Sequence, residues 1–523
     1  MSTIESNRAA GPPPGSLRRP FVQMFAGGVL GKVLGLIREV LLAATFGTGS
    51  AAAAFRAAQT ATLVPTHTFA NDTLNGGFIP LCGRYLREDP ARARTLYWSV
   101  AALMGAISLA LATLLFVAAD AIVAALVPGF STQDRALTAA MLRAMAIGVP
   151  FYVQAVLANY AEMAAGRYVI ASIRAAVQNV GLIAGILAAA LFRNPLFLGW
   201  GFTAYSVLFA AAAVSSIASH SAFAFTVRLD AREALHGLRE FGRLVRPLLL
   251  LPILQQGAFA AERFVASLIA TEAVASIDYA RAIADSALVL LAIPLGMAGL
   301  SELGKHDAAL VRQKLERLLP ALLLVTVPFS IFLAFNAAGV VQLAFGRGRF
   351  DQSSVAMTAL ILTGLAFGFW AHASGHVLAR ALSAHGRNGR VAATVALAAT
   401  AHIVVNAVSF QTLGALGLGM AASASGLVLL AGTARALHLH TTILRTLGPL
   451  AAAAILYMPA GFYLRGGGLP SLALSAAVLL ACLALAVLCS RTLRNALATI
   501  RGPVRSRPGT SAAERVLTLG RTS

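Results

Sequence analysis

The chain has 523 residues, of which 58% are hydrophobic and only 12% are charged, and its mean hydropathy is +0.77. These values exclude a soluble globular protein, because such proteins are about one quarter charged. The formal net charge of +21 does not indicate a nucleic-acid partner, since Lys and Arg fall mainly in short loops between apolar stretches. The composition therefore predicts a membrane protein.

Apolar stretches long enough to cross a hydrocarbon core of about 30 Å recur along almost the whole chain. Charged or glycine-containing breaks separate them, which predicts an all-α polytopic membrane protein with about fourteen transmembrane helices. We expect these helices at residues 21–46, 55–83, 97–127, 136–161, 167–192, 196–226, 246–271, 276–301, 317–345, 353–379, 390–410, 412–434, 446–464 and 467–490.

A long basic segment divides the first twelve predicted helices into six and six, which indicates two lobes around a central cavity, related by duplication. Adjacent opposite charges at Arg38-Glu39 and Glu262-Arg263 support the repeat. The expected division is a disordered tail at 1–20, an N-lobe at 21–226, a basic loop at 227–245, a C-lobe at 246–434, two further helices within 435–490 and a basic tail at 491–523.

The distribution of Lys and Arg between loops predicts the topology, because cytoplasmic loops carry the excess. It predicts an even number of helices in a bacterial inner membrane, with the tails and the basic loop in the cytoplasm. The cytoplasmic set includes Arg84, Arg87, Arg92, Arg94, Arg228, Arg232, Arg239, Arg243, Arg246, Lys305, Arg312, Lys314 and Arg317. The opposite set holds Arg135, Arg193, Arg347, Arg349 and Arg465.

The first predicted helix contains Lys32, Arg38 and Glu39 within an apolar run. Each buried charge costs about 2.5–3.5 kcal/mol on membrane-insertion scales, so these side chains are expected to face a polar interior. Lys32 and Glu39 are seven positions apart and therefore share a helix face. The alternative is that the charges neutralise one another or reach the membrane surface.

The seventh and eighth predicted helices carry further charges. Glu262 and Arg263 lie beside two glutamines, Gln255 and Gln256, in one polar stripe of the seventh helix. In the eighth helix the three- and four-residue spacing places one cation between two carboxylates on one face. This triad is either a part of the cavity or a self-neutralised structural element; its members are Asp278, Arg281 and Asp285.

The second predicted helix has a polar, glycine-containing break at Asn71, Asp72, Asn75, Gly76 and Gly77. Non-helical backbone at membrane depth requires protein or water around it. We expect a broken helix that lines a cavity, with a turn at the helix end as the alternative. Arg56 near the other end is a further candidate cavity cation, although it could also reach the membrane surface.

No metal site and no cofactor are predicted. His372 and His376 have the i, i+4 spacing of metal ligands, but no third ligand is evident. His402 and Asn406 favour hydrogen bonding between helices. A phosphate-binding G-x-x-x-x-G-K-[ST] loop is absent, which disfavours transport driven by ATP hydrolysis in this chain. Its three cysteines have no pairing or ligand spacing.

Three stretches of the first two helices carry a resemblance to a known family. They are residues 32–39 (KVLGLIRE), 46–49 (FGTG) and 78–80 (FIP). The sequence resembles the MurJ/MviN family of lipid II flippases, within the MOP exporter superfamily. The resemblance implies two six-helix lobes around a central cavity, two C-terminal helices that form a lipid-facing groove, and a role in peptidoglycan biosynthesis. It also implies that Lys32 and Arg38 contact the diphosphate of the substrate.

The chain departs from the family pattern at Ala53, at Thr66 and His67, across residues 71–78, and at Ala282, where the family arginine stands one position early as Arg281. These departures raise the possibility of a paralogue that moves an exopolysaccharide or O-antigen repeat unit.

The function expected is therefore that of a non-enzymatic flippase for an undecaprenyl-pyrophosphate-linked saccharide, working by alternating access. Its partners would be that lipid, membrane lipids and cell-envelope synthesis proteins. A MATE-like drug antiporter is disfavoured because acids do not dominate the cavity. A membrane transferase is disfavoured because the outer loops are short. A scaffold protein remains a further alternative. Lys32, Arg38, Arg56, Arg263 and Arg281 would hold the diphosphate, and Glu39, Glu262, Asp278 and Asp285 would position them or bind a coupling ion.

Overall fold

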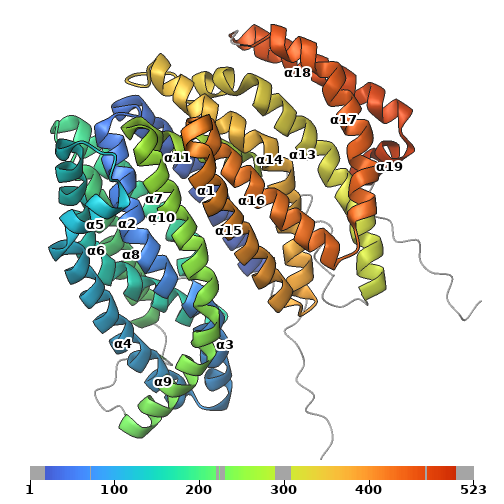
Figure 1. Ribbon diagram of the computed structural model, residues 1–523. Coiled ribbons are helices and arrows are strands. Elements are labelled where there is room, and N and C mark those ends of the chain that lie inside the picture. The colour runs from blue at the N-terminus through green and yellow to red at the C-terminus, as the bar shows by residue number, and fades with distance from the viewer. Residues whose placement is uncertain are drawn as a thin grey trace, which may run out of the picture.

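The computed structural model describes residues 18–70, 72–218, 223, 230–288, 308–465 and 468–501, and all regular elements in these ranges are helical (Figure 1). The all-α prediction is confirmed. The expected tail residues 1–17 and 502–523 and the residues 289–301 of the eighth predicted helix lie outside the described ranges.

The N-lobe packs through close helix contacts that depend on glycine. A Cβ atom on Gly181 would lie 2.4 Å from the Cβ of Tyr205, and one on Gly185 would lie 2.8 Å from the Cα of Gly201. Small residues at such crossings let helices pack closely within a membrane. The helices of this lobe are α1 (Arg18–Phe46), α2 (Ser50–Ala70), α3 (Asp72–Glu88), α4 (Pro90–Val117), α5 (Ala119–Leu126), α6 (Thr132–Ala164), α7 (Val169–Leu191) and α8 (Phe197–Ala218).

The C-lobe uses the same device where two of its helices cross. A Cβ on Gly364 would lie 2.4 Å from the carbonyl oxygen of Leu416, and Ser423 donates a hydrogen bond of 2.6 Å to the Gly364 carbonyl. The helices of this lobe are α10 (Leu250–Ile269), α11 (Thr271–Ala287), α13 (Ala308–Phe345), α14 (Gln352–Ala384), α15 (Asn388–Leu413) and α16 (Ala415–Ala436).

Three C-terminal helices lie on the outer side of α13: α17 (His440–Tyr463), α18 (Leu469–Cys489) and α19 (Arg491–Arg501). The Tyr457 hydroxyl accepts a hydrogen bond of 3.1 Å from Asn336 of α13 and also contacts the Ser475 hydroxyl of α18. The first part of the expected basic tail is therefore ordered as α19. Leu493 and Ala496 explain this difference, because both are buried on the face that packs against α13 and α18.

The basic loop expected at 227–245 also contains a helix, α9 (Ala231–Val245), which the short helix η2 (Arg246–Leu248) joins to α10. Phe241 and Val245 are buried on one face of α9, while Arg239 and Arg243 lie on its exposed side. An amphipathic pattern of period 3.6 inside a basic segment accounts for this helix.

Each of the fourteen expected transmembrane segments overlaps a described helix or a pair of consecutive helices, and the sixth and eighth segments extend beyond the described residues. By length and hydropathy alone, ten of the described helices could span a membrane, or eleven if α9 and α10 form one bent span. The ten do not include α1, α2, α3, α10 and α11. These five helices carry the predicted site residues, and two of them, α3 and α11, are too short to qualify, with 17 described residues each.

The two lobes meet where α1 turns into α2 and α10 turns into α11, which we call the corner end, opposite α9 at the bottom of Figure 1. The Tyr279 hydroxyl donates to the carbonyl of Gly47 at 3.0 Å, and the Thr48 and Ser354 hydroxyls lie 2.8 Å apart. The Gly129 amide donates to the Ser267 hydroxyl at 3.3 Å. The corner end is thus closed by direct contacts between the lobes.

Candidate functional site

A cavity of about 650 Å³ lies between the lobes on the inner side of the corner end. Helices α1, α2 and α7 line it from the N-lobe, and α10 and α11 line it from the C-lobe. We call it the interlobe cavity. Its charged lining residues are Lys32, Arg38, Glu39, Arg56, Asp278, Arg281 and Asp285.

Helix α1 brings two cations to the interlobe cavity. Lys32 is exposed there, and no ion pair joins it to any residue of the described ranges. The Arg38 guanidinium pairs with the adjacent Glu39 carboxylate, and 18% of the Arg38 side chain remains accessible. Lys32 and Arg38 are therefore the α1 charges that a ligand in the cavity can reach.

Arg56 of α2 is buried between two carboxylates. Its guanidinium pairs with Glu39, and its Nε lies 3.3 Å from Oδ2 of Asp278 in α11. Only 5% of its side chain is accessible. Arg56 therefore joins α1, α2 and α11 through ion pairs, and little of its side chain is open to a ligand.

Arg263 of α10 is also held by protein groups. Its Nη2 donates to both carboxylate oxygens of Asp278, at 2.5 and 2.6 Å, and its Nε donates to the Thr60 hydroxyl at 3.1 Å. A further donor contacts the carbonyl of Val274. This arginine does not line the interlobe cavity; it ties α10 to α11 and to α2.

Arg281 of α11 has a different partner from the one that the sequence indicates. Its Nη2 donates to Glu262 of α10 at 2.7 Å, and its guanidinium carbon lies 5.0 Å from the centre of the Phe259 ring. Asp278, which the spacing placed beside it, instead pairs with Arg56 and Arg263. The alternative of a triad neutralised within one helix is therefore wrong, because Arg281 and Asp278 form their ion pairs with residues of other helices.

The charges of the site are nearly balanced: five cations accompany the four acids Glu39, Glu262, Asp278 and Asp285. Buried ion pairs lose several kcal/mol of hydration, and loss of one partner leaves an uncompensated charge. Asp285 is exposed to the cavity, and no ion pair is recorded for it within the described ranges. Lys32 and Asp285 thus differ from the other ionic residues in their freedom to bind a ligand or ion.

The polar break of the second predicted helix is shorter than expected. Helix α2 ends at Ala70 and α3 begins at Asp72. Asn71 and the side chain of Asp72 lie outside the described residues, whereas Asn75, Gly76 and Gly77 are inside α3.

The two glycines pack against η2 and α9, which connect the lobes, rather than facing the interlobe cavity. A Cβ on Gly76 would lie 2.8 Å from Leu248, and one on Gly77 would lie 2.6 Å from Val245. Their small size is explained by this packing. Neither they nor Asn75 line the cavity.

Several lining residues were not singled out from the sequence. Asn179 of α7 is buried and donates to the carbonyls of Gly31 and Ala175, both at 2.9 Å, which fixes α7 against α1. Thr60 and Gln59 were missed because hydroxyl and amide groups are common in membrane helices. Gln59 and Thr60 lie three and four positions after Arg56 and therefore share its helix face. This shared polar face is the signal that would have identified them.

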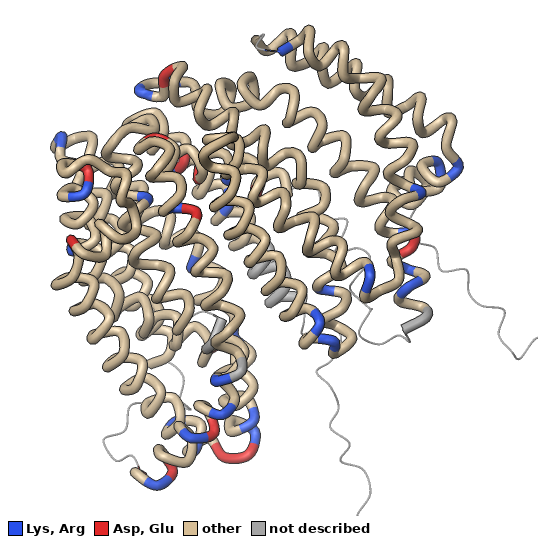
Figure 2. Tube along the Cα trace, in the orientation of Figure 1, with Lys and Arg blue, Asp and Glu red and all other residues tan. Residues whose placement is uncertain are grey.

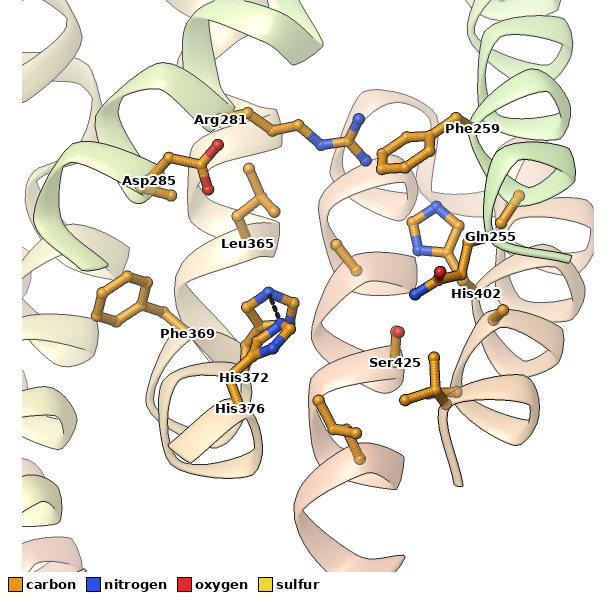
Figure 3. Close-up of a pocket in the computed structure, with 18 of the residues that line it drawn as sticks. Gln255, Phe259, Arg281, Asp285, Leu365, Phe369, His372, His376, His402 and Ser425 are labelled. Carbon is orange, nitrogen blue, oxygen red and sulfur yellow. Dashed lines mark hydrogen bonds between the residues drawn. The ribbon is translucent and has the colours of Figure 1, made fainter. Parts of the chain in front are cut away.

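A second hollow of about 410 Å³ adjoins the interlobe cavity within the C-lobe (Figure 3). His372 and His376 line it, with their Nε2 atoms 3.1 Å apart. His402 reaches across from α15, and its Nε2 lies 3.4 Å from the Glu262 carboxylate. A search of the described residues for three or more His, Cys, Asp or Glu side chains able to hold a metal ion finds no such group.

Comparison with known proteins shows which family the chain matches. A profile of the family described as "Lipid II flippase MurJ" matches residues 42–467, which is most of the chain. A probable lipid II flippase MurJ of Thermotoga maritima is 23% identical over 400 residues, covering 76% of this chain and 81% of the relative. One from Synechocystis is 25% identical over 384 residues, covering 68% of this chain and 69% of the relative.

Solved structures of the same architecture agree with the fold. A structure described as lipid II flippase MurJ in an inward closed conformation aligns with a TM-score of 0.77 at 16% identity, covering 90% of this chain and 100% of that one. An inward-facing multidrug-resistance MATE transporter of the MOP superfamily aligns with a TM-score of 0.63 at 13% identity, covering 82% and 99%.

Proposed function

Because this chain belongs to the family of the lipid II flippase MurJ, we propose that it is a flippase that carries an undecaprenyl-pyrophosphate-linked saccharide across the membrane by alternating access. It makes and breaks no covalent bond. The observation that carries this proposal is the charged cavity between two lobes that are in contact at one end. Peptidoglycan synthesis consumes such a lipid on the outer face of the membrane.

Lys32 and Arg38 bind the diphosphate, and Arg281 completes the site from the opposite lobe. Phosphate oxygens form strong hydrogen bonds with cations in a site shielded from water. Lys32 forms no ion pair within the described ranges, while Arg38 and Arg281 have accessible side chains of 18% and 20%. Arg56 and Arg263 act as positioning residues, since both are more than nine-tenths buried in contacts with protein groups.

The membrane orientation follows from the loop charges. Lys and Arg are concentrated around α9 and the neighbouring end of α3 (Figure 2). The positive-inside rule therefore places α9 in the cytoplasm and the corner end on the outer side of the inner membrane. In this orientation the contacts between the lobes close the outer side, so the structure is a state that receives substrate from the cytoplasmic side.

The membrane potential favours outward movement of the anionic head group. Each elementary charge that crosses the field contributes about 2.3 kcal/mol per 100 mV. Because the carboxylates of the site already offset most of its cations, these cations cancel only part of the negative charge of the diphosphate. The bound head group therefore keeps part of its charge during the crossing. The carboxylates of the cavity, Asp285 above all, are the groups that a coupling cation would contact.

Complementation in cells depleted of their lipid II flippase tests the proposal. We expect the wild-type chain to restore growth, and we expect Lys32→Ala and Arg38→Ala to lose that activity while Arg347→Ala, an exposed cation outside the cavity, retains it. Rescue that survives both cavity substitutions would refute the diphosphate site. Failure of the wild type, together with loss of an exopolysaccharide in the native host after deletion, would assign the chain to another lipid-linked saccharide.

A further inference from the structure

The hollow within the C-lobe is a compartment of its own, which we call the C-lobe chamber (Figure 3). Helices α10, α11, α14, α15 and α16 line its volume of about 410 Å³, which falls in the range of small-ligand sites. It shares Gln256, Phe259, Arg281 and Asp285 with the interlobe cavity. A ligand held between the lobes can therefore extend into it.

The lining of the C-lobe chamber differs in chemistry from that of the interlobe cavity. Its ionic residues, Arg281 and Asp285, both lie at the shared boundary. Its remaining polar groups are amides, imidazoles and one hydroxyl, and they come from four helices. These residues are Gln255, Gln256, His372, His376, His402 and Ser425.

The histidine pair contributes at least one uncharged ring to this lining. The Nε2 atoms of His372 and His376 share a contact of 3.1 Å, so one nitrogen must accept a hydrogen bond and its ring must be neutral. Amide, neutral imidazole and hydroxyl groups each both donate and accept hydrogen bonds. A sugar hydroxyl has the same double capacity.

An aromatic ring is exposed at the entrance of the chamber. Phe259 lines both compartments and is 44% accessible, and the Arg281 guanidinium lies over its ring. A flat apolar ring beside a small number of convergent polar groups is typical of a site for a ring-shaped polar ligand. Asp285 and the neighbouring Glu262 would repel a carboxylate, so an uncharged ring fits better than an acidic one.

We infer that the C-lobe chamber binds the sugar ring attached to the diphosphate, while the diphosphate itself lies on Lys32, Arg38 and Arg281. The inference rests on the proposed function and adds the part of the substrate that the second compartment recognises. Arg281, at the shared boundary, contacts the junction between phosphate and sugar. Gln255, His376 and Ser425 contact the sugar hydroxyls.

Binding to two related lipids tests this inference with the purified full-length chain. The probes are undecaprenyl pyrophosphate and the same lipid carrying one N-acetylated hexose. The test variant combines Gln255→Leu with His376→Phe, and the matched control combines Gln342→Leu with His440→Phe, outside both compartments. Loss of two hydrogen bonds is expected to weaken binding of the sugar-bearing lipid about tenfold in the test variant alone.

The bare lipid distinguishes the possible outcomes. Unchanged binding of undecaprenyl pyrophosphate by the test variant, with weaker binding of the sugar-bearing lipid, supports the sugar site and shows that the variant is folded. Equal effects on the two lipids, or no effect on either, overturn the sugar site and leave the diphosphate site standing. If the wild type binds neither lipid, the proposed function fails and the inference fails with it.

Discussion

Asp278 holds two arginines at once, and this shared pairing explains why the buried charges of the site are not equivalent. It accepts hydrogen bonds from Arg263 at 2.5 and 2.6 Å and lies 3.3 Å from the Nε of Arg56. These two cations come from different lobes. Removal of the Asp278 charge would leave Arg263 without a carboxylate partner and Arg56 with Glu39 alone.

Neutralisation of Asp278 should therefore destabilise the protein, whereas the same change at Asp285 should not. We expect Asp278→Asn to lower the free energy of unfolding by about 3 kcal/mol, because a buried charge pair loses one partner. Asp285→Asn is the matched control on the same helix, since no ion pair is recorded for Asp285 in the described ranges. Thermal unfolding in detergent measures both, and equal melting temperatures would contradict the network.

The sequence locates the charges of the site but not their partners. An ionisable residue inside an apolar run is recognisable from one sequence, which is why Lys32, Arg38 and Glu262 stand out. The pairing of Arg281 with Glu262 depends on how α10 crosses α11, and spacing within one helix cannot reveal it. The division into ligand-binding and positioning cations likewise requires the packed structure.

Helix α9 connects the lobes and is fastened to α3 by an ionic contact at its surface. Glu240 of α9 accepts hydrogen bonds from the Tyr85 hydroxyl at 2.6 Å and from Arg84. The hydrogen bond from Arg84 is the largest contribution that holds the pKa of the Glu240 carboxyl below its ordinary value of 4.5. A lowered carboxyl pKa stabilises the docked helix above pH 4.5, and this stabilisation is lost as the pH falls below that value.

Substitution of Glu240 should show how much its contact with Arg84 and Tyr85 stabilises the docked α9. Glu240→Gln is expected to increase hydrogen exchange across α9 at neutral pH, because the carboxylate no longer binds Arg84 and Tyr85. Glu233→Gln is the matched control, since its partner Arg92 lies 3.7 Å away and both side chains are largely exposed. Hydrogen-exchange mass spectrometry, corrected for intrinsic rates, compares them. Equal protection in the two variants would show that the Glu240 contact does not hold α9.

Long apolar elements were predictable, and short amphipathic ones were not. The boundaries of α6, α14 and α16 agree with the predicted spans to within a few residues. The sequence predicts only a basic loop and a basic tail at α9 and α19, because the arginine content there outweighs the spacing of the apolar residues Phe241, Val245, Leu493 and Ala496. The buried face of each short helix exists only because another helix lies beneath it.

At the scale of the whole molecule, direct contacts between the lobes close the corner end. A Cβ atom on Gly129 would lie 1.8 Å from the carbonyl oxygen of Ser267, so this closure requires glycine. The two-lobe architecture was predictable from the hydropathy pattern and the basic segment between the lobes. Which end is closed was not predictable, because it depends on contacts between residues far apart in the sequence.

Gly129→Ala should therefore hold the lobes apart at the corner end. We expect a lower yield of the disulfide between cysteines introduced by Thr48→Cys and Ser354→Cys, whose hydroxyls lie 2.8 Å apart in the closed structure. Gly448→Ala is the control, since a Cβ there meets no atom within 4 Å. Gel mobility after oxidation reports the yield, and equal yields would show that this glycine contact is dispensable for closure.

The same cysteine pair tests alternating access itself, when it is introduced into a chain whose three native cysteines are replaced by alanine. Transport of undecaprenyl-pyrophosphate-linked saccharide is measured in proteoliposomes before and after oxidation, with Thr48→Cys alone as the control. We predict that the cross-linked chain loses transport, that reduction restores it, and that the single-cysteine chain is unaffected by oxidation. Transport by the fully cross-linked chain at the rate of its reduced form would contradict the mechanism.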